Sequence, residues 1–169
     1  TSVEKFLVSR RLMYWQVYMH KSVVAAENML VKIIERAQWL LAQKDDAIET
    51  GTVLDYFLSE FTGKLADIDL NAYCQLDDTD ILSAIKKWQH HKDPVISLLC
   101  NRLLNRKSFK CKMQDKPISA SEWDEAYALV KAKFPMNEQD LSFLCFKGEA
   151  TNTLYKNDAS VEPWNCQVS

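Results

Sequence analysis

Residues Arg10–Ala37 read RRLMYWQVYMHKSVVAAENMLVKIIERA, and this stretch decides the fold. Its start combines aromatic, basic and imidazole side chains, and its remainder is an ordinary amphipathic sequence. Neither Gly nor Pro occurs between Thr1 and Thr50, so we expect one helix, capped by Ser2, that runs to about Gln43. Apolar residues recur every three or four positions along two stripes, which predicts a central helix that packs on both sides.

The composition indicates a helical protein with one substantial core. The chain has 169 residues, of which 47% are hydrophobic, and contains only three Gly and four Pro. A formal net charge of −2 excludes a general basic field for nucleic acid. No apolar run approaches the roughly 20 residues of a membrane span. The odd, scattered cysteines form no CxxC pair, so we expect reduced thiols in a cytoplasmic protein. They are Cys74, Cys100, Cys111, Cys145 and Cys166.

Capping residues divide the middle of the chain into short helices. We expect a helix at Val53–Phe61 and another that Asp77 or Asp78 caps. Asp93-Pro94 is a strong start signal for the next helix, because a capping carboxylate precedes Pro at the first helical position. Residues 1–105 are therefore predicted to form one helical region.

The pattern changes at residue 106. Ser108–Met113 alternates between apolar and polar side chains, which is typical of a half-buried strand. A helix is expected at Glu122–Lys133, opened by Ser119 or Ser121. Further strands are expected at Leu141–Cys145 and at Leu154–Tyr155, before a loop-like end. The predicted fold class is mainly α, with a long central helix, shorter helices and a small antiparallel β region in the C-terminal third. Residues 106–169 then form a small α+β appendage.

The most unusual cluster of side chains lies at the start of the long helix. Arg10, Tyr14, Tyr18 and Lys21 follow one another at steps of four, four and three, so they share one side of a helix. Such a face suits a nucleotide, because the cations contact phosphate and a tyrosine ring stacks on a base. The same pattern also fits an aromatic core helix whose Arg and Lys reach solvent along their apolar stems.

Other polar groups have structural explanations. His90-His91 ends a helix, where cationic side chains suit the negative end of the dipole. No HExxH or CxxC pattern accompanies these histidines to form a metal site. The basic run from Arg102 to Lys112 is interpreted either as a solvated edge or as an anion site. As a nucleic-acid site this run is short and contains one aromatic residue, Phe109, so nucleic-acid binding is disfavoured.

Three strings resemble a known family. They are EKFLVSRRLMYWQVYMHKSVVAAENMLVKIIERA (4–37), LDDTDILSAIKKWQ (76–89) and NRLLNRKSFK (101–110). They resemble HD-domain metal-dependent phosphohydrolases, specifically the bacterial branch similar to deoxynucleoside-triphosphate triphosphohydrolases. The resemblance covers about residues 3–115 and is most specific at the first string.

The resemblance implies a hydrolase whose divalent metal is held by a His, a His-Asp dyad and a further Asp. This chain contains no His-Asp dipeptide, and its histidines are His20, His90 and His91. We therefore expect a C-terminal portion without catalytic or metal-binding residues of its own, inactive alone. Its partner would be the N-terminal HD catalytic region of the same protein, and a homo-oligomer is a further expectation.

The resemblance also assigns roles to individual residues. Arg10 matches a residue that contacts phosphate, and Tyr18 matches an aromatic residue at the substrate's sugar and base. Tyr14 stands where some relatives have His, and we group it with the substrate-binding residues. Lys21, Arg106 and Lys110 match basic positions that contact an effector triphosphate between subunits in nucleotide-regulated relatives. The alternative is a helical interaction or oligomerisation module without nucleotide contact, because a helix apolar on two sides needs a partner.

Overall fold

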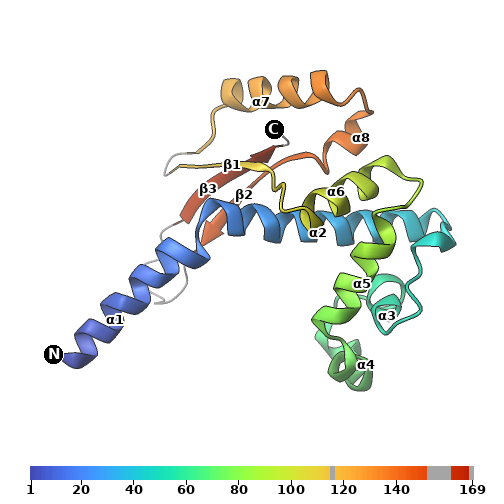
Figure 1. Cartoon of the computed structure of the whole chain (residues 1–169), viewed down its shortest axis with the longest axis horizontal. Helices are drawn as coiled ribbons and strands as arrows, with labels where there is room; N and C mark the ends of the chain where they lie inside the picture. The colour runs from blue at the N-terminus through green and yellow to red at the C-terminus, as the bar shows by residue number, and fades with distance from the viewer. Residues whose placement is uncertain (115–116, 152–160, 168–169) are drawn as a thin grey trace. The chain divides into compact units, whose positions relative to one another are not determined.

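The computed structural model describes residues 1–114, 117–151 and 161–167, and it confirms a mainly helical chain with a small antiparallel sheet (Figure 1). The chain divides into two compact units. The first comprises Thr1–Asn28 together with Ser108–Ser169, and the second comprises Met29–Lys107. The long helix thus contributes its first turns to one unit and its remainder to the other.

The N-terminal helical segment of the first unit is interrupted, which corrects the prediction of one continuous helix. Helix α1 (Ser2–Met13) is followed by a π-helical segment, η1 (Tyr14–Tyr18), and helix α2 (Lys21–Ala42) begins after a break. Figure 1 shows the change of direction between α1 and the first turns of α2. The cap of α1 is Thr1 rather than Ser2, because Thr1 forms a reciprocal capping box with Glu4.

The first unit also contains a three-stranded sheet, in which β3 lies between β1 and β2. The strands are β1 (Lys110–Met113), β2 (Cys145–Thr151) and β3 (Val161–Gln167), all antiparallel to their neighbours. Helix α7 (Ala120–Lys133) packs on this sheet against β2 and β3, and the short helix α8 (Glu138–Leu141) leads into β2 (Figure 1). Helix α7 is capped by Ser119, which was one of the two predicted caps.

Two of the three strand predictions need comment. The second strand begins at Cys145, where the predicted strand ended, because residues 141–144 complete α8 and a tight turn. The strand predicted at Leu154–Tyr155 lies outside the described residues. Strand β3 occupies part of the segment predicted to be loop-like, so that prediction was wrong. A strand at the centre of a sheet is stabilised by pairing on both sides, which local sequence does not reveal.

The second unit is a helical core. Besides residues 29–42 of α2, it contains α3 (Leu54–Ser59), α4 (Leu70–Gln75), α5 (Asp78–Trp88) and α6 (Pro94–Leu104), with single 3₁₀ turns at Asp46–Ile48 and Leu65–Asp67. Asp77 caps α5 and Asp93 caps α6, as predicted. The largest fully buried side chains of this unit come from three helices, α2, α5 and α6, and one 3₁₀ turn. They are Met29, Ile33, Ile48, Ile85, Trp88, Val95, Ile96, Leu99 and Cys100.

Two long-range polar contacts fix this core. Arg36 is only 2% exposed, and its guanidinium contacts both carboxylate oxygens of Asp93, with Nη2 to Oδ2 at 2.7 Å and Nε to Oδ1 at 3.2 Å. The same guanidinium lies 4.2 Å from the centroid of the Trp39 ring. The indole Nε1 of Trp88 donates to the backbone carbonyl oxygen of Ile48 at 2.8 Å. The contacts of Arg36 with Asp93 and of Trp88 with Ile48 join segments far apart in sequence, so both constrain how the helices pack.

His91 belongs to the same network rather than to a simple helix end. Its Nδ1 accepts a hydrogen bond from the backbone amide of Asp93 at 3.0 Å, so the proton of the neutral ring lies on Nε2. That Nε2 lies 3.6 Å from Oδ2 of Asp45, which Lys92 contacts at 3.2 Å. The histidine therefore orders the loop before α6.

Candidate functional site

Arg10, Tyr14 and Tyr18 form a ridge along α1 and η1. The Arg10 guanidinium carbon lies 5.8 Å from the centroid of the Tyr14 ring, within cation–π range. The Tyr14 and Tyr18 ring centroids are 5.0 Å apart, with the rings inclined at 48°. Arg10 is exposed, Tyr14 is half-buried and Tyr18 is 52% exposed. The residues predicted to bind substrate are thus neighbours on a surface open to a ligand.

The π-helical segment sets the spacing of the two tyrosines. Its distinguishing hydrogen bond runs from the backbone amide of Met19 to the carbonyl oxygen of Tyr14, at 2.8 Å. A π turn inserts one residue relative to an α turn, and such insertions are frequent at functional sites. The only local signal is that YWQVY consists mainly of aromatic and β-branched residues, which have low helix propensity. That signal was too weak to predict the π turn.

A cavity of about 370 Å³ adjoins the ridge. It is lined by Phe6, Ser9, Arg10, Met13 and Tyr14, so it offers apolar side chains beside one guanidinium and two hydroxyl groups. Sequence reasoning did not select the first, second and fourth of these residues. Phe6, Ser9 and Met13 follow one another at steps of three and four, so they share one helix face, and this spacing was the signal that could have found them.

Helix α1 exposes apolar side chains around much of its circumference. Within the described part of the chain no residue of α1 is buried. The large apolar side chains of this helix are between 43% and 67% exposed. They are Val3, Phe6, Leu7, Val8, Leu12 and Met13. A helix that exposes apolar side chains on several sides is normally covered by other polypeptide.

His20 and Lys21 lie at the start of α2. The Nδ1 of His20 accepts a hydrogen bond from the backbone amide of Ser22 at 3.3 Å, and its carbonyl oxygen accepts from the amide of Val24 at 3.1 Å. Lys21 is therefore the first helical residue, at the positive end of the helix dipole. A cation there costs helix stability, whereas an anion bound nearby would remove that cost.

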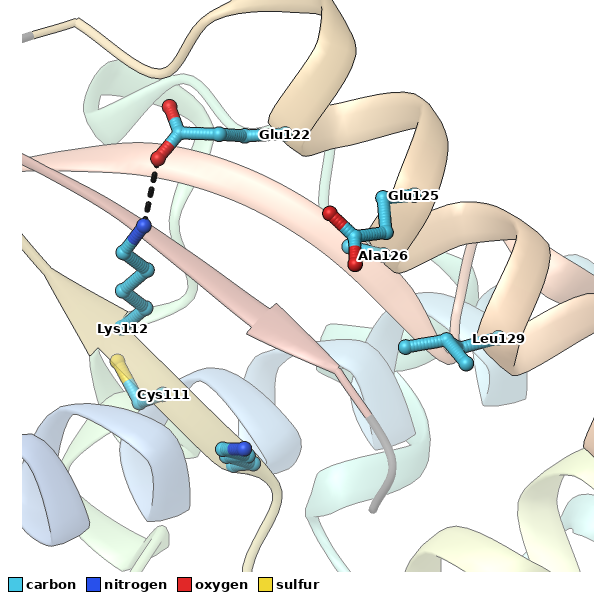
Figure 2. Close-up of a pocket in the computed structure, with 7 residues that line it drawn as sticks. Cys111, Lys112, Glu122, Glu125, Ala126 and Leu129 are labelled. Atoms are coloured by element: carbon cyan, nitrogen blue, oxygen red, sulfur yellow. Dashed lines mark hydrogen bonds and ion pairs between the residues drawn. The ribbon is translucent and has the colours of Figure 1, made fainter.

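The other two predicted effector residues lie in different units. Arg106 follows α6 with φ of 55°, a left-handed conformation, and belongs to the second unit. Lys110 belongs to the first unit and lines a cavity of about 350 Å³ between β1 and α7. Figure 2 shows this cavity, with Lys112 of β1 directed toward Glu122 of α7.

Charge pairing partly neutralises the cavity between β1 and α7. The Lys112 ammonium contacts a carboxylate oxygen of Glu122 at 2.6 Å, and Ser119 donates to the other oxygen through both its backbone amide and its hydroxyl. The lysine and then the serine hold the pKa of Glu122 at about 2. Lys110 and Glu125 line the same cavity without an ion pair between them among the described residues.

The residues of the described ranges do not fit the divalent metal of the resembling family. No group of three His, Cys, Asp or Glu side chains in residues 1–114, 117–151 and 161–167 could hold a metal ion. His91 is already engaged by the backbone amide of Asp93, and His20 by that of Ser22. The same described ranges contain no helix long and apolar enough to cross a membrane.

The fold is similar to that of a solved phosphohydrolase. The crystal structure of a phosphohydrolase from Bacteroides thetaiotaomicron is similar to this chain with a TM-score of 0.85 and 26% sequence identity. The similarity covers 99% of this chain and 50% of that chain.

A sequence relative extends the comparison. The uncharacterized protein YwfO of Bacillus subtilis is 38% identical over 109 residues, which make up 64% of this chain and 24% of YwfO. This chain therefore spans about half the length of the solved phosphohydrolase and about a quarter of YwfO. No protein-family model matches the sequence.

Proposed function

We propose that this chain is the C-terminal portion of a cytoplasmic HD-type phosphohydrolase that acts on nucleotides, and that it supplies one wall of the substrate pocket. The observation that carries the proposal is the exposed ridge of Arg10, Tyr14 and Tyr18 beside a cavity. The structural relative is a phosphohydrolase, which supports phosphoryl chemistry. The sequence resemblance to the branch similar to deoxynucleoside-triphosphate triphosphohydrolases is the reason for proposing nucleotides as the substrate class.

The ridge suits a nucleotide by its chemistry. A guanidinium presents paired donors to phosphate oxygens, and Arg10 is exposed with its planar group beside Tyr14. Tyr18 is 52% exposed and lies one turn further along than Tyr14, where a sugar or base could pack on its ring. Phe6 and Met13 would add apolar contacts at the cavity wall.

The proposed partner of this wall is an N-terminal HD region that holds the divalent metal. Hydrolysis of a phosphate ester by such enzymes uses the metal to activate water and neutralise charge on phosphorus. The apolar circumference of α1 gives that region a surface to cover. This chain alone is then expected to release neither phosphate nor triphosphate from a deoxynucleoside triphosphate in the presence of Mn²⁺.

Regulation by a nucleotide effector is a further part of the proposal. Lys21, Arg106 and Lys110 would contact its phosphates, in an assembly of more than one copy. Two observations support this assignment. Lys21 lies where a cation is unfavourable unless an anion is near, and Arg106 keeps a left-handed conformation that glycine adopts at lower cost. Residues that break local rules in this way are often retained for function.

The test uses the longer protein that contains this chain. Arg10→Ala and Tyr18→Ala are compared with two matched controls, Arg11→Ala on the same helix and Tyr73→Ala, an exposed tyrosine of α4. Steady-state hydrolysis of deoxynucleoside triphosphates with Mn²⁺ should fall at least roughly tenfold in kcat/KM for the first pair only, because one charge-assisted contact is worth about 1.5–3 kcal/mol.

Two outcomes would oppose the proposal. Robust hydrolysis by the isolated chain would show that the catalytic groups lie within it. Unchanged kinetics of the ridge variants, combined with altered sedimentation of the longer protein, would favour the alternative of an interaction or oligomerisation module.

A further inference from the structure

Two leucines of the second unit are more exposed than any other large apolar side chain among the described residues. Leu65, in a 3₁₀ turn, is 82% exposed, and Leu70, the first residue of α4, is 69% exposed. Within residues 62–75 every residue is exposed except the half-buried Ile68 and the buried Ala72. Exposed apolar side chains that gather in one segment are typical of a surface that binds another molecule.

Hydrogen bonds hold this exposed segment in an ordered position. The Tyr56 hydroxyl of α3 accepts from the backbone amide of Asp69 at 2.9 Å and donates to the carbonyl oxygen of Asp67 at 3.3 Å. The Thr62 hydroxyl donates to a carboxylate oxygen of Asp67 at 3.0 Å. The Asp69 side chain caps α4 by accepting from the backbone amide of Asn71 at 2.8 Å. The leucines are therefore presented by an ordered framework of α3, α4 and the start of α5 (Figure 1).

The segment around the leucines is strongly acidic. Residues 55–80 contain seven acidic residues and one basic residue, Lys64, so their formal charge is −6, whereas that of the whole chain is −2. The acidic residues are Asp55, Glu60, Asp67, Asp69, Asp77, Asp78 and Asp80. None of the seven forms an ion pair with another described residue. Their charge is therefore available to a partner of opposite sign.

This charge decides which kind of partner fits the surface. A second copy that docked through the same surface would bring like charges together, and nucleic acid or an anionic lipid surface would also be repelled. The described residues of the surface form helices and one 3₁₀ turn, so they offer no strand edge to an extended peptide. A helix with basic side chains beside an apolar stripe complements both the leucines and the carboxylates.

We propose that the surface of residues 55–80 docks a basic amphipathic helix of another polypeptide. Leu65 and Leu70 lie against the apolar stripe of that helix, and the carboxylates of Glu60 and Asp78 lie against its lysine or arginine side chains. These two carboxylates are exposed and accept no hydrogen bond from a described residue. The surface lies entirely within the second unit and shares no residue with the ridge.

Binding of a designed peptide to the whole chain tests this surface. The probe is a synthetic amphipathic helix of leucine and lysine, about 18 residues or roughly five turns long, with a fluorescent label read by anisotropy. Two matched control peptides replace every lysine by glutamate or every leucine by serine. The leucine–lysine peptide should bind saturably and the glutamate peptide should not bind. The serine peptide should bind at least roughly tenfold more weakly, because burying a single leucine side chain contributes about that factor.

Variants of the chain locate the bound peptide. Leu70→Ser should weaken binding at least roughly tenfold. Leu129→Ser changes a 62% exposed leucine of α7 in the first unit and should leave binding unchanged. Glu60→Gln/Asp78→Asn should weaken binding severalfold at low ionic strength, and this difference should vanish at high salt, where exposed charges are screened. All four side chains are exposed, so the fold should persist, which circular dichroism checks.

Four results would overturn the proposal. One is the absence of saturable binding of the leucine–lysine peptide up to about 1 mM. Another is equally tight binding of the glutamate peptide, which would indicate nonspecific apolar adsorption. A third is that Leu70→Ser weakens binding no more than Leu129→Ser, which would place the peptide elsewhere. The last is self-association of the free chain that Leu70→Ser abolishes in sedimentation velocity, which would make a second copy the occupant.

Discussion

Replacing Asp93 by Asn removes one charge from a buried ion pair and leaves a helix cap in place. The Asp93 carboxylate accepts two hydrogen bonds from Arg36 and one from the backbone amide of Ile96. Asn is as good a cap as Asp, so the first turn of α6 should persist. The Arg36 guanidinium, 2% exposed, would then lose its ion pair with the Asp93 carboxylate.

The expected loss of stability follows from this geometry. Removing one partner of a buried ion pair costs about 3–5 kcal/mol. The amide oxygen of Asn can keep one bond to the guanidinium, and the Asp93 side chain is 11% exposed, so we expect about 2–3 kcal/mol. Asp77→Asn is the matched control, because Asp77 also caps a helix but is exposed. It should cost less than about 0.5 kcal/mol.

The pH dependence of the difference gives a second measurement. Burial alone would raise the pKa of Asp93, but the hydrogen bonds from Arg36 and Ile96 outweigh it and lower that pKa below its ordinary value of 3.8. A carboxyl group with a lowered folded pKa contributes its full stability above 3.8 and loses it as the pH falls through the folded pKa. The stability gap between wild type and Asp93→Asn should therefore close only in acid.

Urea unfolding followed by far-UV circular dichroism measures these free energies. The double variant Arg36→Met/Asp93→Asn should be less destabilised than the sum of the two single variants, by at least about 1 kcal/mol, because the two side chains contact each other directly and each single variant removes the same ion pair. The reasoning is refuted if Asp93→Asn costs no more than Asp77→Asn, or if the two single effects simply add.

Three further predictions concern other described residues. Glu122 has a folded pKa of about 2, so its contribution to stability is complete above 4.5 and is lost as the pH falls toward about 2. Lys112→Met should raise that pKa, which NMR titration of the carboxyl group measures. Arg106→Gly and the control Lys44→Gly relieve left-handed backbone at φ of 55° and 63°, so urea unfolding should show each variant stabilised by about 0.5–1 kcal/mol. A loss of stability in either would contradict this account of strain. Trp88→Phe removes a buried donor to a backbone carbonyl and should cost about 2 kcal/mol, with faster amide exchange in the loop before α3.

Helix starts were the most predictable features of this chain. Asp77, Asp93 and Ser119 cap helices in the structure as expected, because a cap bonds to amides only two or three residues away. The first helix shows the limit of this locality. Thr1 caps it in place of Ser2, since only Thr1 pairs reciprocally with Glu4.

The candidate site was predictable as a set of residues but not as a geometry. The spacing of Arg10, Tyr14 and Tyr18 placed them on one helix face, and the structure brings them together. The π turn that sets the distance between the tyrosines was missed, and so was the cavity lined by Phe6 and Met13. A π turn depends on one displaced hydrogen bond, and no residue type specifies it.

The mainly helical class, the caps at Asp77, Asp93 and Ser119, and the ridge could be predicted because each depends on contacts within one or two helical turns. The contact of Asp93 with Arg36 and the central place of β3, where it pairs with β1, are seen only in the folded chain. These contacts join positions more than 50 residues apart. Their formation depends on how whole elements pack and pair, which no local pattern of side chains encodes.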